Sequence, residues 1–266
     1  MYKNFLIIAS KLDEAGINIA TALSQFKMSN VTIQFIDSEI IEDSGMPTEL
    51  INQHDFIIFA SKHESAKKDK TLSIHAPGNP SRRAELGGQV NKLCPTSAFL
   101  QKQLFENLNQ LTEEHSLAEK YKVTLECTHH GPLINKPCLF IEIGATLAEW
   151  RDKRAAFVVA KTIKKTIEEL KTNPYNEIAI GIGGPHYCPS FNKIQLNSNF
   201  AISHIIPQYC LPITEEVIRE AISKTQEEVD FVLIDWKGVG VAEERDRILD
   251  ILKKNNINYK KTKEIK

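Results

Sequence analysis

The chain has 266 residues, enough to bury a substantial core, and its 42% hydrophobic and 25% charged residues are ordinary for a globular protein in water. A net charge of −1 argues against a uniformly basic nucleic-acid-binding protein, so a nucleic acid would have to contact a local basic patch. No apolar stretch approaches the roughly 20 residues of a membrane helix, and residues 1–8 show no signal-peptide cleavage site.

Short β-branched apolar runs bounded by turn residues predict strands, and apolar residues repeating every three to four positions predict helices. In chain order these patterns predict strand 5–9, helix 13–26, strands 31–36, 56–60 and 71–76, helix 100–111, strands 125–127 and 139–143, helix 146–170, strand 178–182, helix 214–223, strand 231–234 and helix 242–254. The third of these helices is expected to start at a capping box, Thr146 to Glu149.

This alternation predicts an α/β fold with a mixed, mostly parallel sheet flanked by helices. We find no internal repeat, low-complexity tract or long Gly/Ser linker, so we expect one domain over residues 1–266. Residues 62–95 have few long apolar runs and many Gly, Pro and Arg residues. A loop region of that size is usually functional or mobile.

Five of the eight histidines stand at a strand end or just past it, beside Gly, Pro or small polar residues. They are His63, His75, His129, His130 and His186. Ligands of open α/β sheets bind beyond the carboxyl ends of the strands, so parallel strands would bring these side chains to one edge. Two pairs of neighbouring runs could instead form hairpins, which would send one strand's end to the opposite edge.

His186 follows two glycines, Gly183 and Gly184, whose consecutive N–H groups could bind a phosphate or a developing oxyanion. Tyr187 places an aromatic ring beside it. Asn79 lies in a Pro-Gly-Asn-Pro turn and displays an amide that could donate to an oxyanion. These residues predict one wall of a hydrolytic pocket.

Glu142 interrupts an apolar strand, where a carboxylate needs a hydrogen-bond donor, a cation or a metal. Adjacent strand residues point to opposite sides, so we expect only one of His129 and His130 to serve a given site. The chain contains no P-loop, dinucleotide fingerprint, GxSxG elbow or HExxH motif. Two chemistries stay open: activation of water by histidine and carboxylate, or a zinc site with three protein ligands.

Basic residues gather in the loop region and could contact RNA phosphates, although such runs are more often solvated surface. They are Lys62, Lys67, Lys68, Lys70, Arg82 and Arg83. The five cysteines are widely spaced and contain no C-x-x-C pair, which favours free thiols in a reducing cytoplasm. We therefore expect a cytoplasmic protein that does not enter a membrane.

Five motifs occur in a fixed order along the chain. They are Lys62-His63-Glu64-Ser65, Leu72-Ser73-Ile74-His75-Ala76-Pro77-Gly78-Asn79, Thr128-His129-His130-Gly131-Pro132, Phe140-Ile141-Glu142-Ile143-Gly144-Ala145-Thr146 with Glu149-Trp150, and Gly181-Ile182-Gly183-Gly184-Pro185-His186-Tyr187. Together, over roughly residues 1–240, they resemble the archaeal and plant type of D-aminoacyl-tRNA deacylase. The sequence departs from that pattern at Ala76, Ala145 and Pro185, and no departure removes a histidine.

The resemblance implies hydrolysis of the ester that joins a D-amino acid to the 3′ end of tRNA. It also implies zinc, tRNA as partner with no obligate protein partner, and a fold related to peptidyl-tRNA hydrolase and phosphorylase-like proteins. On this interpretation His75, His130 and His186, with Glu142, bind zinc or activate water.

Asn79 and the amides of Gly183 and Gly184 would stabilise the oxyanion. The tRNA would be contacted by Lys62, His63, Lys67, Lys68, Arg82, Arg83 and Tyr187. Two alternatives are a metal-dependent peptidase or amidohydrolase acting on small substrates, and a non-catalytic tRNA-binding module.

Overall fold

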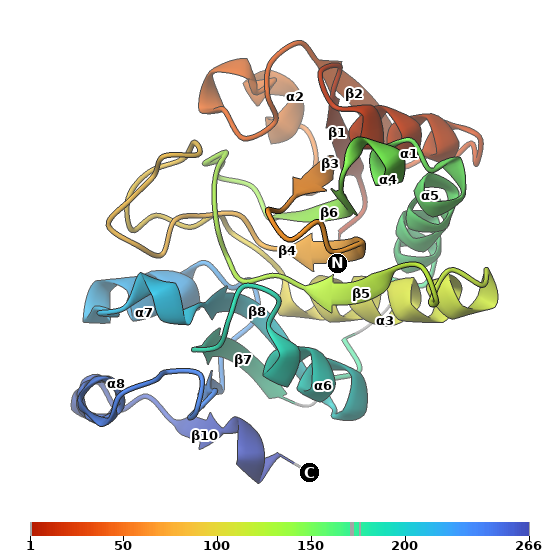
Figure 1. Cartoon of the computed structure of the whole chain (residues 1–266). Helices are drawn as coiled ribbons and strands as arrows, with labels where there is room; N and C mark the ends of the chain where they lie inside the picture. Colours follow the sequence, from red (N-terminus) through yellow and green to blue (C-terminus); the bar gives the residue numbers. More distant parts are fainter. Residues whose placement is uncertain (1, 171–172, 176, 266) are drawn as a thin grey trace.

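The computed structural model describes residues 2–170, 173–175 and 177–265, and its strands form two sheets (Figure 1). The six-stranded sheet has the order β2-β1-β3-β6-β4-β5, and the four-stranded sheet has the order β10-β9-β7-β8. The strands are β1 (Phe5–Ser10), β2 (Val31–Ile36), β3 (Phe56–Glu64), β4 (Thr71–His75), β5 (Lys122–Leu125), β6 (Cys138–Ala145), β7 (Glu177–Ile182), β8 (Phe200–Ile206), β9 (Phe231–Ile234) and β10 (Tyr259–Lys261).

The six-stranded sheet is mixed, which confirms the fold class expected from the sequence. Strands β2, β1, β3 and β6 run parallel, whereas β4 is antiparallel to β6 and β5 runs parallel to β4. The four-stranded sheet is parallel throughout. The sequence did not show that the strands divide between two sheets, because apolar patterning reports burial and not which strands pair.

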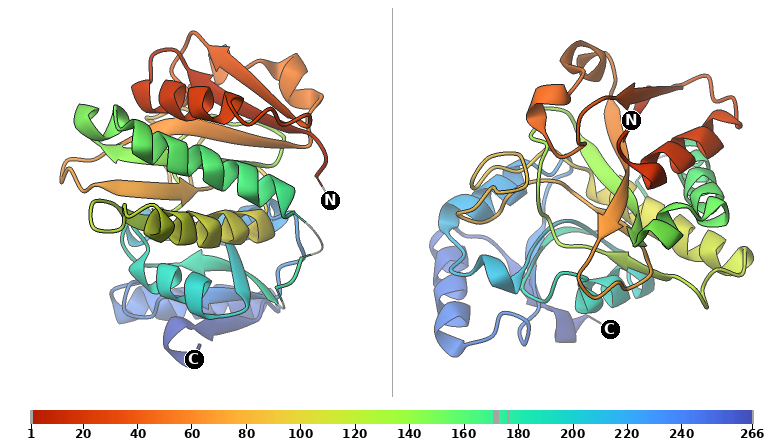
Figure 2. Two further views of the ribbon diagram at one scale, coloured as in Figure 1. Left: turned by 90° about the vertical axis from the view of Figure 1, so that its right-hand side faces the viewer. Right: turned by 45° about the horizontal axis from the view of Figure 1, so that its top comes forward.

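Helices cover one face of the six-stranded sheet, and Figure 2 (left) shows three of them side by side. They are α1 (Glu14–Ser24), α3 (Ala98–Glu114) and α5 (Lys153–Glu168). Alternate residues of the central strands, such as Ile58 and Ile141, pack in the core beneath these helices. The intervening residues therefore face the other way, and that second face carries the site.

The helix expected over 146–170 is interrupted. The structure has a short helix α4 (Leu147–Trp150) and then α5, because Asp152 caps a new helix by accepting hydrogen bonds from the Arg154 and Ala155 N–H groups. Thr146 precedes α4, and its hydroxyl donates to the Glu149 carboxylate rather than accepting from the backbone. The short helix α2 (Thr48–Asn52) was not predicted from the sequence.

The four-stranded sheet packs with α6 (Pro189–Asn197), α7 (Glu215–Ser223) and α8 (Ala242–Lys254) (Figure 1). Strands β8 and β10 and helix α6 were not predicted. Ser203 and His204 interrupt the apolar run of β8. The Ser203 hydroxyl is hydrogen-bonded to Thr225, and the His204 Nδ1 is hydrogen-bonded to Thr128. None of the helices described here is long and apolar enough to cross a membrane.

The two sheets meet beside the end of β5. The N–H of Cys127 donates to the His186 carbonyl, and the N–H of Thr128 donates to the Ile205 carbonyl. Helix α3 packs against strands of both sheets. This junction carries the loop that follows β7, with His186, onto the second face of the six-stranded sheet.

Candidate functional site

Strand alternation gathers buried polar side chains on the second face of the six-stranded sheet, away from α1, α3 and α5. In the register of β3, β6 and β4, Glu142 lies between Ser61 and Ser73, and His63 and His75 lie one row away on opposite sides. The histidines therefore converge on a sheet face and not at the carboxyl edge, because β4 runs antiparallel to β6.

Three imidazole rings form the first part of the site. The ring centroids of His75 and His129 are 4.1 Å apart, those of His75 and His130 are 4.9 Å apart, and those of His129 and His130 are 4.3 Å apart. His130 has a left-handed backbone with φ of 42°, which turns the chain away from strand geometry. Both members of the pair therefore reach the site, contrary to the expectation that only one would.

The backbone fixes the tautomer of these three rings. The Nδ1 atoms of His75, His129 and His130 lie 3.2, 2.8 and 2.6 Å from the carbonyl oxygens of Ala76, Cys127 and Gly131. A carbonyl oxygen only accepts, so each Nδ1 carries the proton and each Nε2 keeps its lone pair. The His75 Nε2 is buried and has no hydrogen-bond partner among the described residues.

Two of these rings, those of His129 and His130, favour the neutral state. Burial, together with the neighbouring His75, lowers the pKa of His130 to about 4. Burial and the adjacent imidazoles also hold the pKa of His129 well below its ordinary value. Because a neutral imidazole is the form that binds a metal, His129 and His130 have the protonation state of metal ligands.

A buried carboxylate, Glu126, joins the remaining histidines. Its oxygens lie 3.1 Å from the His63 Nδ1, 2.9 Å from the His186 Nε2 and 3.5 Å from the His129 Nε2. Burial raises the pKa of Glu126, but hydrogen bonding to His186 and His63 outweighs burial and leaves the pKa well below its usual range. Glu126 is therefore an anion at the centre of the site.

His63 lies between two carboxylates. Burial lowers its pKa, but Glu126 and Glu142 outweigh burial and raise the pKa to about 11, so this ring is a cation at neutral pH. Glu142 lies 3.6 Å from the His63 Nδ1 and 3.7 Å from the His75 Nε2. Burial raises the pKa of Glu142, but hydrogen bonding to His63 acts against burial and the pKa is lowered. His63 thus balances one of two buried negative charges.

His186 lies on the accessible side of the cluster, with 32% of its side chain exposed. Its Nδ1 is 3.2 Å from the Tyr209 hydroxyl and 3.4 Å from the Cys127 sulfur. The Tyr187 hydroxyl lies 2.9 Å from the Nε2 of His63. A ligand approaching from solvent would therefore meet His186 first.

The chain is similar to known proteins. A family model described as D-aminoacyl-tRNA deacylase matches residues 50–260. The chain belongs to the D-aminoacyl-tRNA deacylase family. This membership confirms the resemblance seen in the five motifs.

Individual members of the deacylase family match almost the whole chain. The protein named D-aminoacyl-tRNA deacylase from Methanocaldococcus jannaschii is 32% identical over 97% of this chain and 99% of its own length. Its namesake from Pyrococcus furiosus is 34% identical over 88% of this chain and 91% of its own length. A crystal structure described as a conserved protein of unknown function shares the fold, with a TM-score of 0.89 and 26% identity over 98% of this chain and 96% of that chain.

The backbone N–H groups of two glycines, which we expected to bind an oxyanion, already have hydrogen-bond partners. The Gly183 N–H donates to the Ile206 carbonyl at 2.8 Å, and the Gly184 N–H donates to the Gly238 carbonyl at 3.0 Å. Both residues have positive φ, 97° and 84°, which glycine adopts readily. In this structure they turn the chain so that His186 reaches the cluster, and their amides are not free donors.

Asn79 lies in the long loop between β4 and α3. Its Nδ2 donates to the Gly87 carbonyl at 2.8 Å, and its backbone N–H donates to the Lys92 carbonyl at 2.9 Å. The side chain thus fixes the fold of the loop next to the His75 strand.

The basic residues form two separate sets. Lys67 and Lys68 are exposed in the loop before β4, whereas Arg82 and Arg83 are exposed in the loop after it. The two sets therefore lie beyond opposite ends of β4. The Lys62 Nζ lies 5.5 Å from the centre of the Trp150 ring.

Sequence reasoning missed three members of the site, Glu126, Cys127 and Tyr209, and it left His129 out of the ligand set in favour of His130. In the alternating pattern of this strand, Glu126 lies on the same polar side as Thr124 and Thr128. A carboxylate three residues before a histidine pair was the sequence signal that could have indicated its place in the site. Tyr209 follows β8, a strand that was not predicted, so nothing in the sequence placed it near His186.

Proposed function

We propose that this protein hydrolyses the ester bond of D-aminoacyl-tRNA and releases a D-amino acid and free tRNA. The observation that carries this proposal is its membership of the D-aminoacyl-tRNA deacylase family, with relatives of that name aligned over nearly the whole chain. The family comparison favours neither a peptidase nor a binding module without chemistry. An aminoacyl ester is already activated, so a base and electrostatic stabilisation suffice for its hydrolysis.

Zinc is implied by the resemblance, and the donor set supports a site for it. One ring nitrogen each from His75, His129 and His130 lies within 4.8 Å of the other two. Their Nε2 lone pairs are free while their Nδ1 atoms donate to backbone carbonyls, the arrangement that orients metal-binding histidines. These three residues would hold the ion, which when bound would supply Lewis-acid chemistry to the ester.

This set differs from the one inferred from sequence, in which His186 stood in the place of His129. Among the described residues, the groups of ligand atoms that lie within 4.8 Å of one another never combine His75 with His186. His186 instead joins groups with His63 and Glu126, or with Cys127 and His129. We therefore give His186 a proton-transfer role.

Glu126 makes His186 a suitable base. The carboxylate accepts from the Nε2–H at 2.9 Å, so the Nδ1 keeps its lone pair and can take a proton from water. The hydroxyl oxygen of that water attacks the ester carbonyl, and the bond to the ribose oxygen breaks. The leaving ribose oxygen takes the proton back from Nδ1, while Glu126 stabilises the imidazolium formed in between.

Buried charges beyond Glu126 would position this pair. His63 contacts the Oε1 atom of Glu126 while His186 contacts its Oε2 atom, and Glu142 contacts His63 in turn. The Tyr209 hydroxyl lies 3.2 Å from the His186 Nδ1, and so it can orient the His186 ring before water enters. Lys67, Lys68, Arg82 and Arg83 are exposed cations available to the tRNA.

The deciding experiment follows ester loss from matched D- and L-aminoacyl-tRNA carrying the same amino acid. We expect release from the D-form and little from the L-form. Replacement of His186 by Ala should abolish turnover but leave tRNA binding intact. Equal inertness toward both substrates, with metal present, would refute the proposed function. We also propose a cytoplasmic location, which agrees with five unpaired buried cysteines.

A further inference from the structure

A pocket of about 560 Å³ adjoins the histidine cluster. Its lining includes the first residues of the parallel strands β4 and β5, and Figure 1 shows these two strands. The lining includes Tyr187 and the charged residues Lys68, Asp69, Lys70, Glu119, Lys120 and Lys122. Tyr187 connects this pocket to the site, because its hydroxyl lies 2.9 Å from the His63 Nε2 and its ring centroid lies 5.2 Å from that of His186.

The lining of this pocket is cationic. Four lysines face two carboxylates, which leaves a net charge of +2. The Lys70 and Lys120 Nζ atoms are paired with carboxylates outside the pocket, at 3.5 and 2.6 Å. Lys68 and Lys122 form no ion pair with any residue that the structure describes. These two ammonium groups are therefore available to an anionic ligand.

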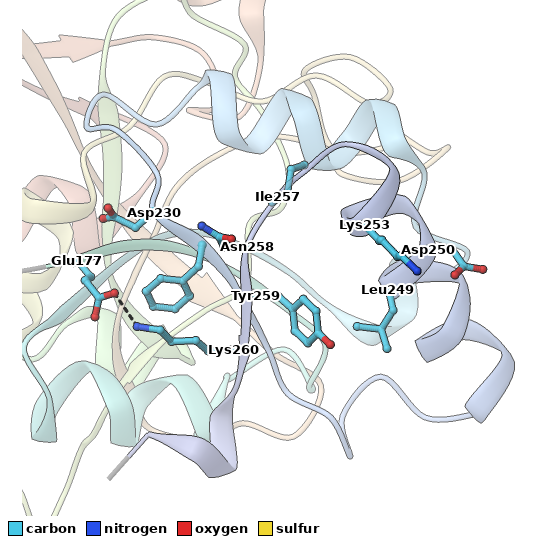
Figure 3. A pocket seen from close by; sticks show the side chains of 10 residues that line it. Glu177, Asp230, Leu249, Asp250, Lys253, Ile257, Asn258, Tyr259 and Lys260 are labelled. Atoms are coloured by element: carbon cyan, nitrogen blue, oxygen red, sulfur yellow. Dashed lines mark hydrogen bonds and ion pairs between the residues drawn. The ribbon is translucent and has the colours of Figure 1, made fainter.

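The larger pocket of about 650 Å³ in Figure 3 has the opposite character. Its lining carries three carboxylates, Glu177, Asp230 and Asp250, against Lys253 and Lys260, for a net charge of −1. Figure 3 shows Lys260 paired with Glu177. No histidine lines it, so it offers neither a phosphate site nor access to the cluster.

A third pocket, of about 450 Å³, supplies a matched comparison. Its lining contains Lys193, Lys237 and Lys263 against Asp235, which again gives +2. No lining residue of this pocket forms a hydrogen bond to a histidine of the cluster within the described ranges. The two pockets therefore have the same net charge. The pocket beside Tyr187 differs in that Tyr187 contacts the histidine cluster.

We propose that the pocket lined by Lys68, Lys122 and Tyr187 binds the single-stranded 3′ end of tRNA. Lys68 and Lys122 would contact backbone phosphates, and a terminal base would pack on the Tyr187 ring, since single-stranded RNA is held by cationic grooves and aromatic stacking. That placement sets the ester beside His186. This inference rests on the proposed deacylase function and names the entry path of its substrate.

The test uses the double variant Lys68→Glu, Lys122→Glu and the control Lys193→Glu, Lys237→Glu, which reverses two lysines in the comparison pocket. KM and kcat are measured on D-aminoacyl-tRNA over a range of salt. We expect the first variant to raise KM about tenfold or more and to flatten the salt dependence, since each lost single-strand phosphate contact removes a slope of about 0.7. We expect kcat to change by less than about twofold, because no group at the reacting atoms is altered.

A minimal substrate separates this pocket from the catalytic centre. We expect 3′-O-D-aminoacyladenosine, which has no phosphate, to be hydrolysed equally by wild type and both variants. An unchanged KM for tRNA in the Lys68, Lys122 variant, or an equal increase in the control, would overturn the proposal.

Failure of the proposed function itself would look different, since wild type would then cleave neither substrate. Binding of uncharged tRNA by the same proteins would still test whether this pocket binds tRNA. Selective loss of salt-dependent binding in the Lys68, Lys122 variant would support it, and equal binding by all three proteins would refute it.

Discussion

At the scale of single residues, the histidines of the site differ in the hydrogen-bond partner of their Nδ1 atom. Carbonyl oxygens face the Nδ1 of His75, His129 and His130, and leave three Nε2 lone pairs for a metal. His186 has the reverse arrangement, because its Nε2 donates to Glu126 and its Nδ1 remains basic. On the proposed function, the same type of side chain would thus serve as ligand or as base according to its local hydrogen bonds.

This division predicts different losses from two alanine variants. The His129→Ala variant should bind substantially less zinc and be inactive, whereas His186→Ala should keep its zinc and lose turnover. Elemental analysis of protein purified without added zinc measures the first effect. His115→Ala, which removes a histidine outside the cluster, is the control. Loss of zinc from the His186 variant, with retention by the His129 variant, would restore the ligand set inferred from sequence.

A histidine away from the cluster makes stability depend on pH. Burial, helped by the charge of Lys224, lowers the pKa of His204 in the folded state from 6.5 to about 3. Between pH 6.5 and 3 the unfolded chain therefore binds a proton that the folded chain does not. As the pH is lowered through that window, the free energy of unfolding decreases by up to about 1.4 kcal/mol per pH unit.

We expect the His204→Gln variant to show a shallower loss of stability between pH 6 and 4 than wild type in urea unfolding, although it is less stable at pH 7. His54→Gln removes a histidine whose two ring nitrogens are bonded to Leu50 and Thr32, and serves as the control. Parallel pH profiles for wild type and the His204 variant would contradict the assignment.

At the scale of elements, helix α1 lies close to the strand that carries His63. A Cβ atom on Gly16 would lie 2.5 Å from the Ala60 carbonyl oxygen, and Asp13, the N-cap of α1, accepts from the Lys62 N–H at 2.7 Å. The start of α1 thus fixes β3 immediately before His63.

Replacing Gly16 with Ala should therefore destabilise the fold, although alanine favours a helix by about 1 kcal/mol. We expect a net loss of about 1–3 kcal/mol in urea unfolding, because the strand backbone must move. The exposed Thr21→Ala variant on the same helix should change stability by less than about 0.5 kcal/mol. A Gly16→Ala protein as stable as wild type would show that α1 and β3 can separate at no cost.

Helices and strands with regular apolar periodicity were predictable from sequence, because each buries one continuous row of apolar side chains. Strand β8 was not, since Ser203 and His204 find buried partners only after folding. The site shows the same limit. His75 and Glu142 could be assigned to it from strand alternation, but His129 depends on the left-handed turn at His130 and Glu126 on the junction between sheets.

At the scale of the whole molecule, the two sheets share one core. Ala179, Ile202 and Leu233 of the four-stranded sheet belong to the same buried cluster as Ile58 and Ile141 of the six-stranded sheet. The site also needs both sheets, because His186 follows β7 while its partner Glu126 follows β5. We therefore propose that the chain folds as one domain, as its sequence suggested.

The two tryptophans test this unity, because each reports on a different sheet. Trp150 lies in α4 beside the six-stranded sheet, and Trp236 follows β9 in the four-stranded one. In Trp150→Phe and Trp236→Phe variants, the fluorescence of the remaining tryptophan should follow the same urea transition as the far-UV circular dichroism of that variant, as one cooperative unit requires. Comparing probes within each variant removes the effect of the substitution on stability. A fluorescence transition at lower urea than the dichroism in the Trp150→Phe protein would mean that the four-stranded sheet unfolds first, and with it the loop that presents His186.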